Sequence, residues 1–219
     1  MGAESGSAVP EHLQNNEFAA RTSWEPLRPK DGVNYRTRFS NRQSKHLLTF
    51  EATRTSKVVV VCVLVFSVIC LVIGTLITYL WLSGVGAKGE GDAGVLKFAG
   101  PGFLAGAIFF GGLGFYLKWK LLQPIVFDLR IGRYWRGAST PDDDRSVALA
   151  DVHALQVIEK WVKQTGPNSG GYSSFELNLV MTDGKRHNIV DHGDPEALRA
   201  DAEELGNHLQ KPIWDAAAD

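Results

Sequence analysis

The residues best suited to metal chemistry in this 219-residue sequence lie in one polar segment, RHNIVDHGD, near its C-terminal end. It contains His187, Asp191, His192 and Asp194, and imidazole and carboxylate groups are common ligands of divalent metals. A metal site would need these side chains to converge on one point. On an extended strand, however, His187 and Asp191 share one face and His192 lies on the other, while Asp194 is a good cap for a following helix. We therefore expect a polar strand end and a helix cap, and no metal site.

A second acidic cluster, Asp142–Asp144, lies in a Pro-containing loop. A calcium loop would need spaced ligands, a glycine and a distal glutamate, and these are missing from the sequence around it, so we expect solvated side chains. The sequence contains no P-loop, no GxGxxG after a strand, no HExxH and no GxSxG motif. Both cysteines, Cys62 and Cys70, lie in an apolar run, which leaves no water-exposed thiol as a nucleophile or zinc ligand. We expect no enzymatic activity, no catalytic residue and no cofactor.

Two long apolar stretches dominate the middle of the chain. Val58 to Leu82 contains no charged residue, and Val95 to Leu117 contains only Lys97. About 20 apolar residues suffice to cross the hydrocarbon core of a bilayer. We therefore expect an integral membrane protein with a two-helix transmembrane hairpin: helices over 57–83 and 95–120, joined by a short external loop over 84–94.

Basic residues predict the orientation of this hairpin. Lysines and arginines gather before the first stretch and after the second, whereas the connecting loop carries Lys88 and Lys97 offset by Glu90 and Asp92. The positive-inside rule then places both termini in the cytoplasm. Membrane lipid is the first expected partner.

Small residues recur at four-residue spacing in both stretches, which places them on one helix face. They leave two interpretations open: internal packing of the hairpin, or close packing against the transmembrane helix of a partner protein. The residues concerned are Cys70, Gly74 and Thr78 in the first stretch and Gly102, Gly106, Ala107 and Gly111 in the second.

Outside the apolar stretches, the sequence predicts a mobile N-terminal arm (1–33), a β-hairpin (34–53) and a β-rich domain (124–215). Phe175–Thr182 alternates, with Phe175, Leu177, Leu179 and Met181 predicted to point inward and Glu176 and Asn178 outward. Asp183-Gly184 is typical of a two-residue hairpin turn. Asp194 and Pro195 predict the start of a helix, and Ile213 and Trp214 an apolar tail that folds back onto the sheet. The apolar stripe of that helix is Leu198, Ala202, Leu205 and Leu209.

This order of elements, with two strands before the hairpin, five after it and a C-terminal helix, resembles the pleckstrin-homology-like (PH-like) fold of bacterial membrane-anchored proteins. The resemblance covers Asn34–Thr53 and Pro124–Trp214. It implies an α+β membrane protein whose cytoplasmic antiparallel β-sheet or half-barrel is capped by the C-terminal helix, in a bacterial inner membrane. The alternative is a smaller five-strand sheet with a helix, to which the N-terminal hairpin is only loosely attached.

The net charge of -1 conceals two opposite segments. Residues 1–57 carry nine Lys/Arg against six Asp/Glu, whereas residues 125–219 carry ten against sixteen. An acidic domain repels phosphate backbones, so nucleic acid is not an expected partner. We expect a non-enzymatic subunit or scaffold of a larger membrane complex, whose partners are other membrane or cytoplasmic protein subunits docked on exposed aromatic residues. The alternative is a membrane-anchored sensor that binds a small molecule or lipid in the sheet domain. The docking candidates are Trp24, Tyr134, Trp135 and Trp161.

Overall fold

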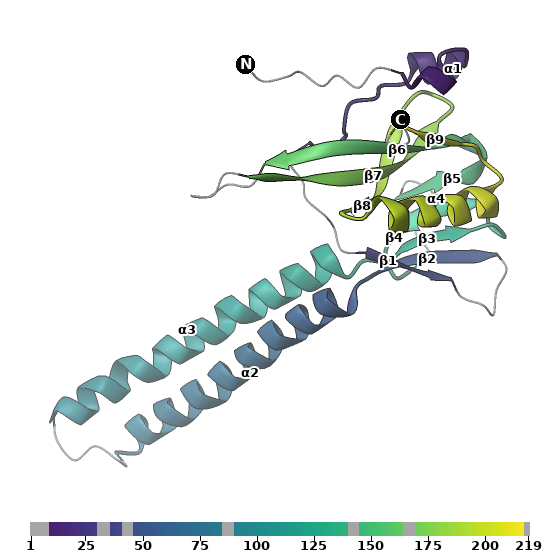
Figure 1. Ribbon diagram of the computed structural model, residues 1–219. Helices are drawn as coiled ribbons and strands as arrows, with labels where there is room; N and C mark the ends of the chain where they lie inside the picture. Colours follow the sequence, from purple (N-terminus) through teal and green to yellow (C-terminus); the bar gives the residue numbers. More distant parts are fainter. Residues whose placement is uncertain are drawn as a thin grey trace. The chain divides into compact units, whose positions relative to one another are not determined.

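The computed structural model describes residues 9–29, 36–40, 46–84, 90–139, 145–163 and 170–216. The chain forms two compact units, each with its own internal contacts. We refer to Ala52–Gln123 as the helical hairpin, and to Met1–Glu51 together with Pro124–Asp219 as the sheet domain. The two units together give the α+β class that the sequence predicts (Figure 1).

The helical hairpin consists of α2 (Arg54–Leu82) and α3 (Glu90–Leu121), which run alongside each other (Figure 1). Both helices are long and apolar enough to span a membrane, and only 17% of the residues in each apolar window are buried within the protein. A helix in the core of a water-soluble protein would be mostly buried. Both helices begin before the predicted bounds of 57 and 95. Thr53 caps α2 by accepting a hydrogen bond from the Ser56 amide, and α3 begins at Glu90.

The first sheet of the sheet domain has the strand order β1-β2-β3-β4-β5. Its pairing joins segments from both sides of the hairpin, because Leu47 and Phe50 of β2 lie opposite Asp128 and Ile125 of β3. The segment before the hairpin therefore belongs to the sheet and is not loosely attached. The bounds are β1 (Arg36–Ser40), β2 (Leu47–Ala52), β3 (Ile125–Asp128), β4 (Arg133–Arg136) and β5 (Ser146–Ala148).

The second sheet has the strand order β8-β7-β6-β9. Its strands are β6 (Val152–Lys163), β7 (Gly171–Met181), β8 (Arg186–His192) and β9 (Ile213–Asp215). The predicted turn at Asp183-Gly184 lies between β7 and β8, and Gly184 has a φ of +82°, which favours glycine. β9 is the predicted apolar tail, and it pairs in parallel with β6.

Helix α4 (Pro195–Leu209) begins where the sequence predicts. The Asp194 side chain accepts hydrogen bonds from the amides of Glu196 and Ala197, and Pro195 occupies the first turn. The predicted apolar stripe of α4 is buried in a core cluster together with residues of β2, β3, β6, β7 and β8. Figure 1 shows the helix beside these strands.

Alternating side chains of β6 contribute to two separate cores, one on each face of the second sheet. Leu155 and Val157 belong to the cluster that includes α4. Ala154 and Ile158 belong to a second cluster, whose other members are Trp214 and residues of the N-terminal segment. The second sheet is therefore covered on both faces, although its strands alternate as if one face met water.

The N-terminal segment 9–29 forms this second cover, so the prediction of a mobile arm is wrong for these residues. It contains a 3-10 turn, η1 (Glu11–Leu13), and a short helix, α1 (Glu17–Arg21). Trp24 is 3% exposed and its indole nitrogen donates to the Ala19 carbonyl, while the Phe18 ring stacks on His153 at 3.9 Å between centroids. Two aromatic anchors thus fix a segment whose composition indicates mobility.

Candidate functional site

Three charged side chains are buried between the second sheet and the N-terminal segment: Lys160 of β6, Glu176 of β7 and Asp191 of β8. We call them the charged cluster. Lys160 Nζ lies 2.8 Å from Glu176 Oε1 and 3.2 Å from Asp191 Oδ1, and each side chain is at most 1% exposed. Taking such charges out of water costs several kcal/mol per ion unless hydrogen bonds and opposite charges compensate for it.

Amide side chains supply part of that compensation. Asn188 Nδ2 donates to Asp191 Oδ1 at 3.1 Å and lies 3.3 Å from Asn178 Oδ1, while Asn178 Nδ2 donates to Glu176 Oε2 at 3.4 Å. Burial raises the pKa of Asp191, and the nearby Lys160 ammonium acts in the opposite direction. The buried carboxylates and amides therefore form one connected network.

The N-terminal segment closes this network with its backbone. The Leu27 and Arg28 amides donate to the two oxygens of Glu176, each at 3.0 Å, and Lys160 Nζ donates to the Arg28 carbonyl at 2.9 Å. Arg186 also donates to the Glu25 carbonyl at 2.9 Å. The hydrogen bonds of the charged cluster thus hold a chain segment in place. We interpret it as a latch for residues 25–28 and not as a catalytic centre.

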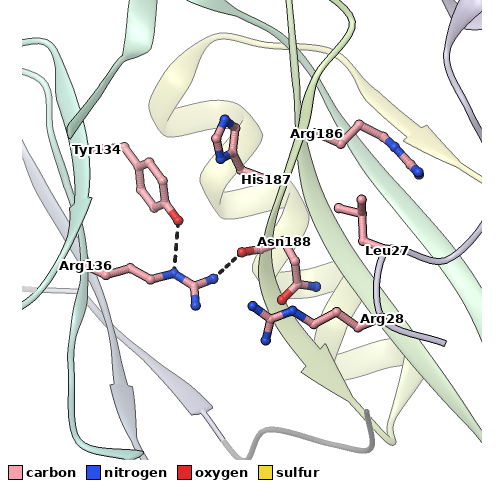
Figure 2. Close-up of a pocket in the computed structure, with 7 residues that line it drawn as sticks. All are labelled: Leu27, Arg28, Tyr134, Arg136, Arg186, His187 and Asn188. Atoms are coloured by element: carbon pink, nitrogen blue, oxygen red, sulfur yellow. Dashed lines mark hydrogen bonds between the residues drawn. The ribbon is translucent and has the colours of Figure 1, made fainter. Parts of the chain in front are cut away.

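A pocket of about 450 Å³ adjoins this latch, at the β8 edge of the second sheet. Tyr134 and Arg136 come from β4, Leu27 and Arg28 from the N-terminal segment, and the remaining lining residues from β8: Arg186, His187 and Asn188. Figure 2 shows the guanidinium groups of Arg28 and Arg136 both lying beside Asn188, whereas the Arg186 guanidinium points away from them.

Hydrogen bonds hold Arg136 in this pocket. Its Nε donates to the Tyr134 hydroxyl at 3.3 Å, and its Nη2 donates to the Asn188 carbonyl (Figure 2). In the part of the chain that the structure describes, the lining contains three arginines and one histidine and no Asp or Glu. Burial lowers the pKa of Arg186, but an arginine remains protonated at neutral pH. The charged side chains that line the pocket are therefore basic, and the nearby carboxylates of Glu176 and Asp191 are hydrogen-bonded to the Arg28 amide and to Asn188.

The predicted docking aromatics are mostly buried. Trp24 belongs to the second core, Tyr134 belongs to the first, and Trp135 is also buried. The expectation that these three are exposed is wrong, because Trp24 and Tyr134 pack in the two cores and Trp135 is only 5% exposed. Trp161 is 61% exposed, and it is the one of the four that a partner could reach.

The residues that resembled metal ligands take other roles. Asp191 belongs to the charged cluster, Asp194 caps α4, and His192 Nδ1 accepts a hydrogen bond from the Asp194 amide. No group of three or more His, Cys, Asp or Glu residues is placed to hold a metal in the part of the chain that the structure describes. Asp142–Asp144 lie outside the described residues.

The small residues of the hairpin divide into two groups. Cys70, Gly74 and Ala107 are buried, and Ser67 Oγ donates to the Ala107 carbonyl at 2.8 Å. A Cβ atom on Gly74 would lie 2.9 Å from the Leu104 amide nitrogen, and one on Gly111 would lie 3.1 Å from Ser67 Oγ.

Thr78 of the same predicted set packs against Gly100, where a Cβ atom would collide with the Thr78 hydroxyl. At Gly102 and Gly106, by contrast, a Cβ atom would have no described heavy atom within 4 Å beyond the local backbone. Five of the predicted small residues therefore pack inside the hairpin, whereas Gly102 and Gly106 do not.

The charged cluster and the basic pocket are absent from the sequence-based expectations. The sequence does contain one indication that Lys160 is buried. Along an extended strand its side chain points to the same face as those of Ala154 and Ile158, and both of these are buried. Glu176 and Asn178 alternate with apolar residues and so were expected to point outward. They do lie on the face away from α4, but the N-terminal segment buries that face. No protein-family model, no curated protein and no solved structure matches this chain.

Proposed function

We propose that this chain is a non-enzymatic integral membrane protein that acts as a subunit or scaffold of a larger membrane complex. The observation that supports it best is the open face of α3 around Gly102 and Gly106. The hairpin would anchor the chain, this face would receive a partner helix, and the sheet domain would carry the water-exposed contacts.

The membrane anchor is supported by the two apolar helices and by their largely uncovered surfaces. Basic residues before α2 and after α3 favour a topology with both termini in the cytoplasm. Labelling single cysteines with a membrane-impermeant maleimide in intact cells, in a variant lacking Cys62 and Cys70, tests this topology. We expect a cysteine at position 88 to react from outside and one at position 130 to react only after lysis.

The open face of α3 has the composition of a helix-docking surface. Gly102 and Gly106 lie along it, and the exposed rings of Phe98 and Phe109 lie one turn before and after them. Glycine is about 1 kcal/mol less favourable than alanine in a helix. Since neither glycine serves the packing of this hairpin, their use is explained by a second backbone that approaches closely.

The sheet domain is the proposed PH-like part of the molecule. The order of strands followed by α4, and two sheets that share one core, support this assignment. The exposed Trp161 ring, which covers Gly171 on the neighbouring strand, is the aromatic residue of this domain best placed to contact a protein partner.

Purification in mild detergent tests the subunit proposal. We expect the wild-type chain to retain a stoichiometric protein partner, and the double variant G102L/G106L to lose it while keeping its own abundance. Gly112→Leu is the matched control, because it makes the same change at another exposed position of α3, about 80° from Gly102 and about 120° from Gly106 around the helix. Retention of the partner by G102L/G106L would contradict the proposal.

A second candidate function is a membrane-anchored sensor that binds a small molecule in the sheet domain. The observation that favours it is the basic pocket, which brings together side chains from β4, β8 and the N-terminal segment. Docking of a partner helix on α3 does not require a basic pocket in the sheet domain.

A further inference from the structure

We propose that the basic pocket binds a small molecule through a phosphoryl group, held by Arg28 and Arg136 beside Asn188. The inference rests on the second candidate function, to which it gives a site and a ligand class. It does not depend on a partner helix.

The guanidinium of Arg136 and the backbone of Arg28 are fixed before any ligand arrives. A guanidinium group carries five N–H donors, and Arg136 uses one on the Tyr134 hydroxyl and one on the Asn188 carbonyl. These contacts fix the plane of its guanidinium and leave further donors. The backbone of Arg28 is fixed by its amide bond to Glu176 and by the Lys160 ammonium on its carbonyl. Because the Arg136 donors are already ordered, less conformational entropy is lost when they bind a ligand.

The charge of the lining selects an oxyanion of high charge. Among the described residues, three arginines and a histidine line the pocket and no Asp or Glu does, while the nearby Glu176 carboxylate is already engaged by the Leu27 and Arg28 amides and by Lys160. Guanidinium groups match phosphate oxygens with paired, charge-assisted hydrogen bonds. A phosphoryl dianion offsets more of this positive charge than a single carboxylate does.

The size of the pocket and its surroundings indicate a small ligand. Ligand pockets are commonly about 300–1,000 Å³, and this one is about 450 Å³. The sheet domain around it is acidic, which opposes an extended polyanion such as nucleic acid. The phosphoryl group could belong to a soluble metabolite or to a lipid headgroup, and the chemistry at the arginines is the same for both.

The position of Arg28 couples this site to the N-terminal segment. Arg28 lines the pocket only while residues 25–28 occupy the latch formed by the charged cluster. A ligand that contacts Arg28 therefore binds the latched form better and stabilises it. We expect the Leu27 and Arg28 amides to exchange hydrogen more slowly when the site is occupied.

The experiment uses the full chain in detergent and measures binding calorimetrically with inorganic phosphate and with pyrophosphate. A parallel arm measures flotation with phosphatidylcholine vesicles, with and without phosphatidic acid. We expect Arg28→Gln and Arg136→Gln to weaken binding about 10-fold or more, in line with the loss of a charge-assisted hydrogen bond. Arg130→Gln, at an exposed arginine in the turn after β3, is the matched control and should bind as the wild type does.

Binding of phosphate or pyrophosphate that both pocket variants weaken supports a soluble ligand. A preference for phosphatidic acid vesicles that the variants abolish supports a lipid source. The proposal is overturned if no probe binds the wild type, or if Arg28→Gln binds as tightly as Arg130→Gln. Arg28→Gln keeps its backbone contacts, so it remains informative if Arg136→Gln fails to fold. Partner loss in G102L/G106L is a separate readout, so the two proposals fail independently.

Discussion

Lys160 is the residue whose removal should destabilise the sheet domain most directly. It is the positive charge between Glu176 and Asp191, and it also donates to the Arg28 carbonyl. Lys160→Met leaves two buried carboxylates without their ammonium group, and breaking such a pair typically costs about 3–5 kcal/mol. We expect a clear drop in the thermal midpoint, followed by tryptophan fluorescence in detergent. Lys163→Met, at an exposed lysine of the same strand, should change it little, and equal effects would contradict the latch.

His208 makes the stability of the sheet domain depend on pH. Burial lowers its pKa from the ordinary value of 6.5, and its Nε2 atom is buried with no hydrogen-bond partner among the described residues. Between the lowered folded pKa and about 6.5 the unfolded chain binds more protons than the folded one, so stability falls as the pH drops through this window. We expect His208→Gln to show a smaller loss of thermal midpoint between about pH 7.5 and pH 5.5. An unchanged slope would exclude His208 as the cause.

At the scale of elements, α3 presents two faces that differ in what a larger side chain would meet. A Cβ on Gly100 collides with Thr78, and one on Gly102 meets open space. We expect Gly100→Leu to separate the two helices and to speed hydrogen exchange in α2 and α3. Gly102→Leu should leave exchange as in the wild type. Similar hydrogen exchange in both variants would contradict the arrangement in which Gly100 packs against Thr78 of α2 and Gly102 does not face α2.

The sequence predicts most elements because their signals are local. Two apolar stretches, a capped helix after Asp194 and a turn at Asp183-Gly184 each depend on neighbouring residues only. The helix ends were less accurate, because α3 begins at Glu90 among residues that are not apolar. Which glycines pack inside the hairpin could not be read from spacing alone, since Gly100 and Gly102 belong to one Gly-rich run and differ only in the direction they face.

At the scale of the whole molecule, the N-terminal segment buries residues whose sequence pattern is typical of the surface. Trp24 looked like an exposed docking residue and is instead an anchor in the second core. Glu176 and Asn178 alternate as solvent-facing residues do, yet they are buried beneath a segment about 150 residues away in the chain. This long-range cover leaves no periodic signal in the sequence. Apart from the strand face that Lys160 shares with Ala154 and Ile158, nothing in the sequence therefore indicates the latch or the pocket beside it.

Trp24→Ala should release this cover. Truncating a buried tryptophan typically costs about 3–5 kcal/mol, so we expect faster hydrogen exchange at residues 18–28 and a lower thermal midpoint. Trp161→Ala makes the same change at an exposed position and should have little effect on either measurement. Unchanged protection of residues 18–28 in Trp24→Ala would show that the tryptophan does not hold the segment.

The claim that the chain is a subunit of a membrane complex is tested most directly by photo-crosslinking in native membranes. A photoreactive amino acid is placed at position 106 on the open face of α3, and at position 68, an exposed position of α2, as the control. We predict a crosslink to a polypeptide of defined mass from position 106 and none of that mass from position 68. Crosslinks to lipid alone from position 106, in membranes where the protein is at its natural abundance, would contradict it.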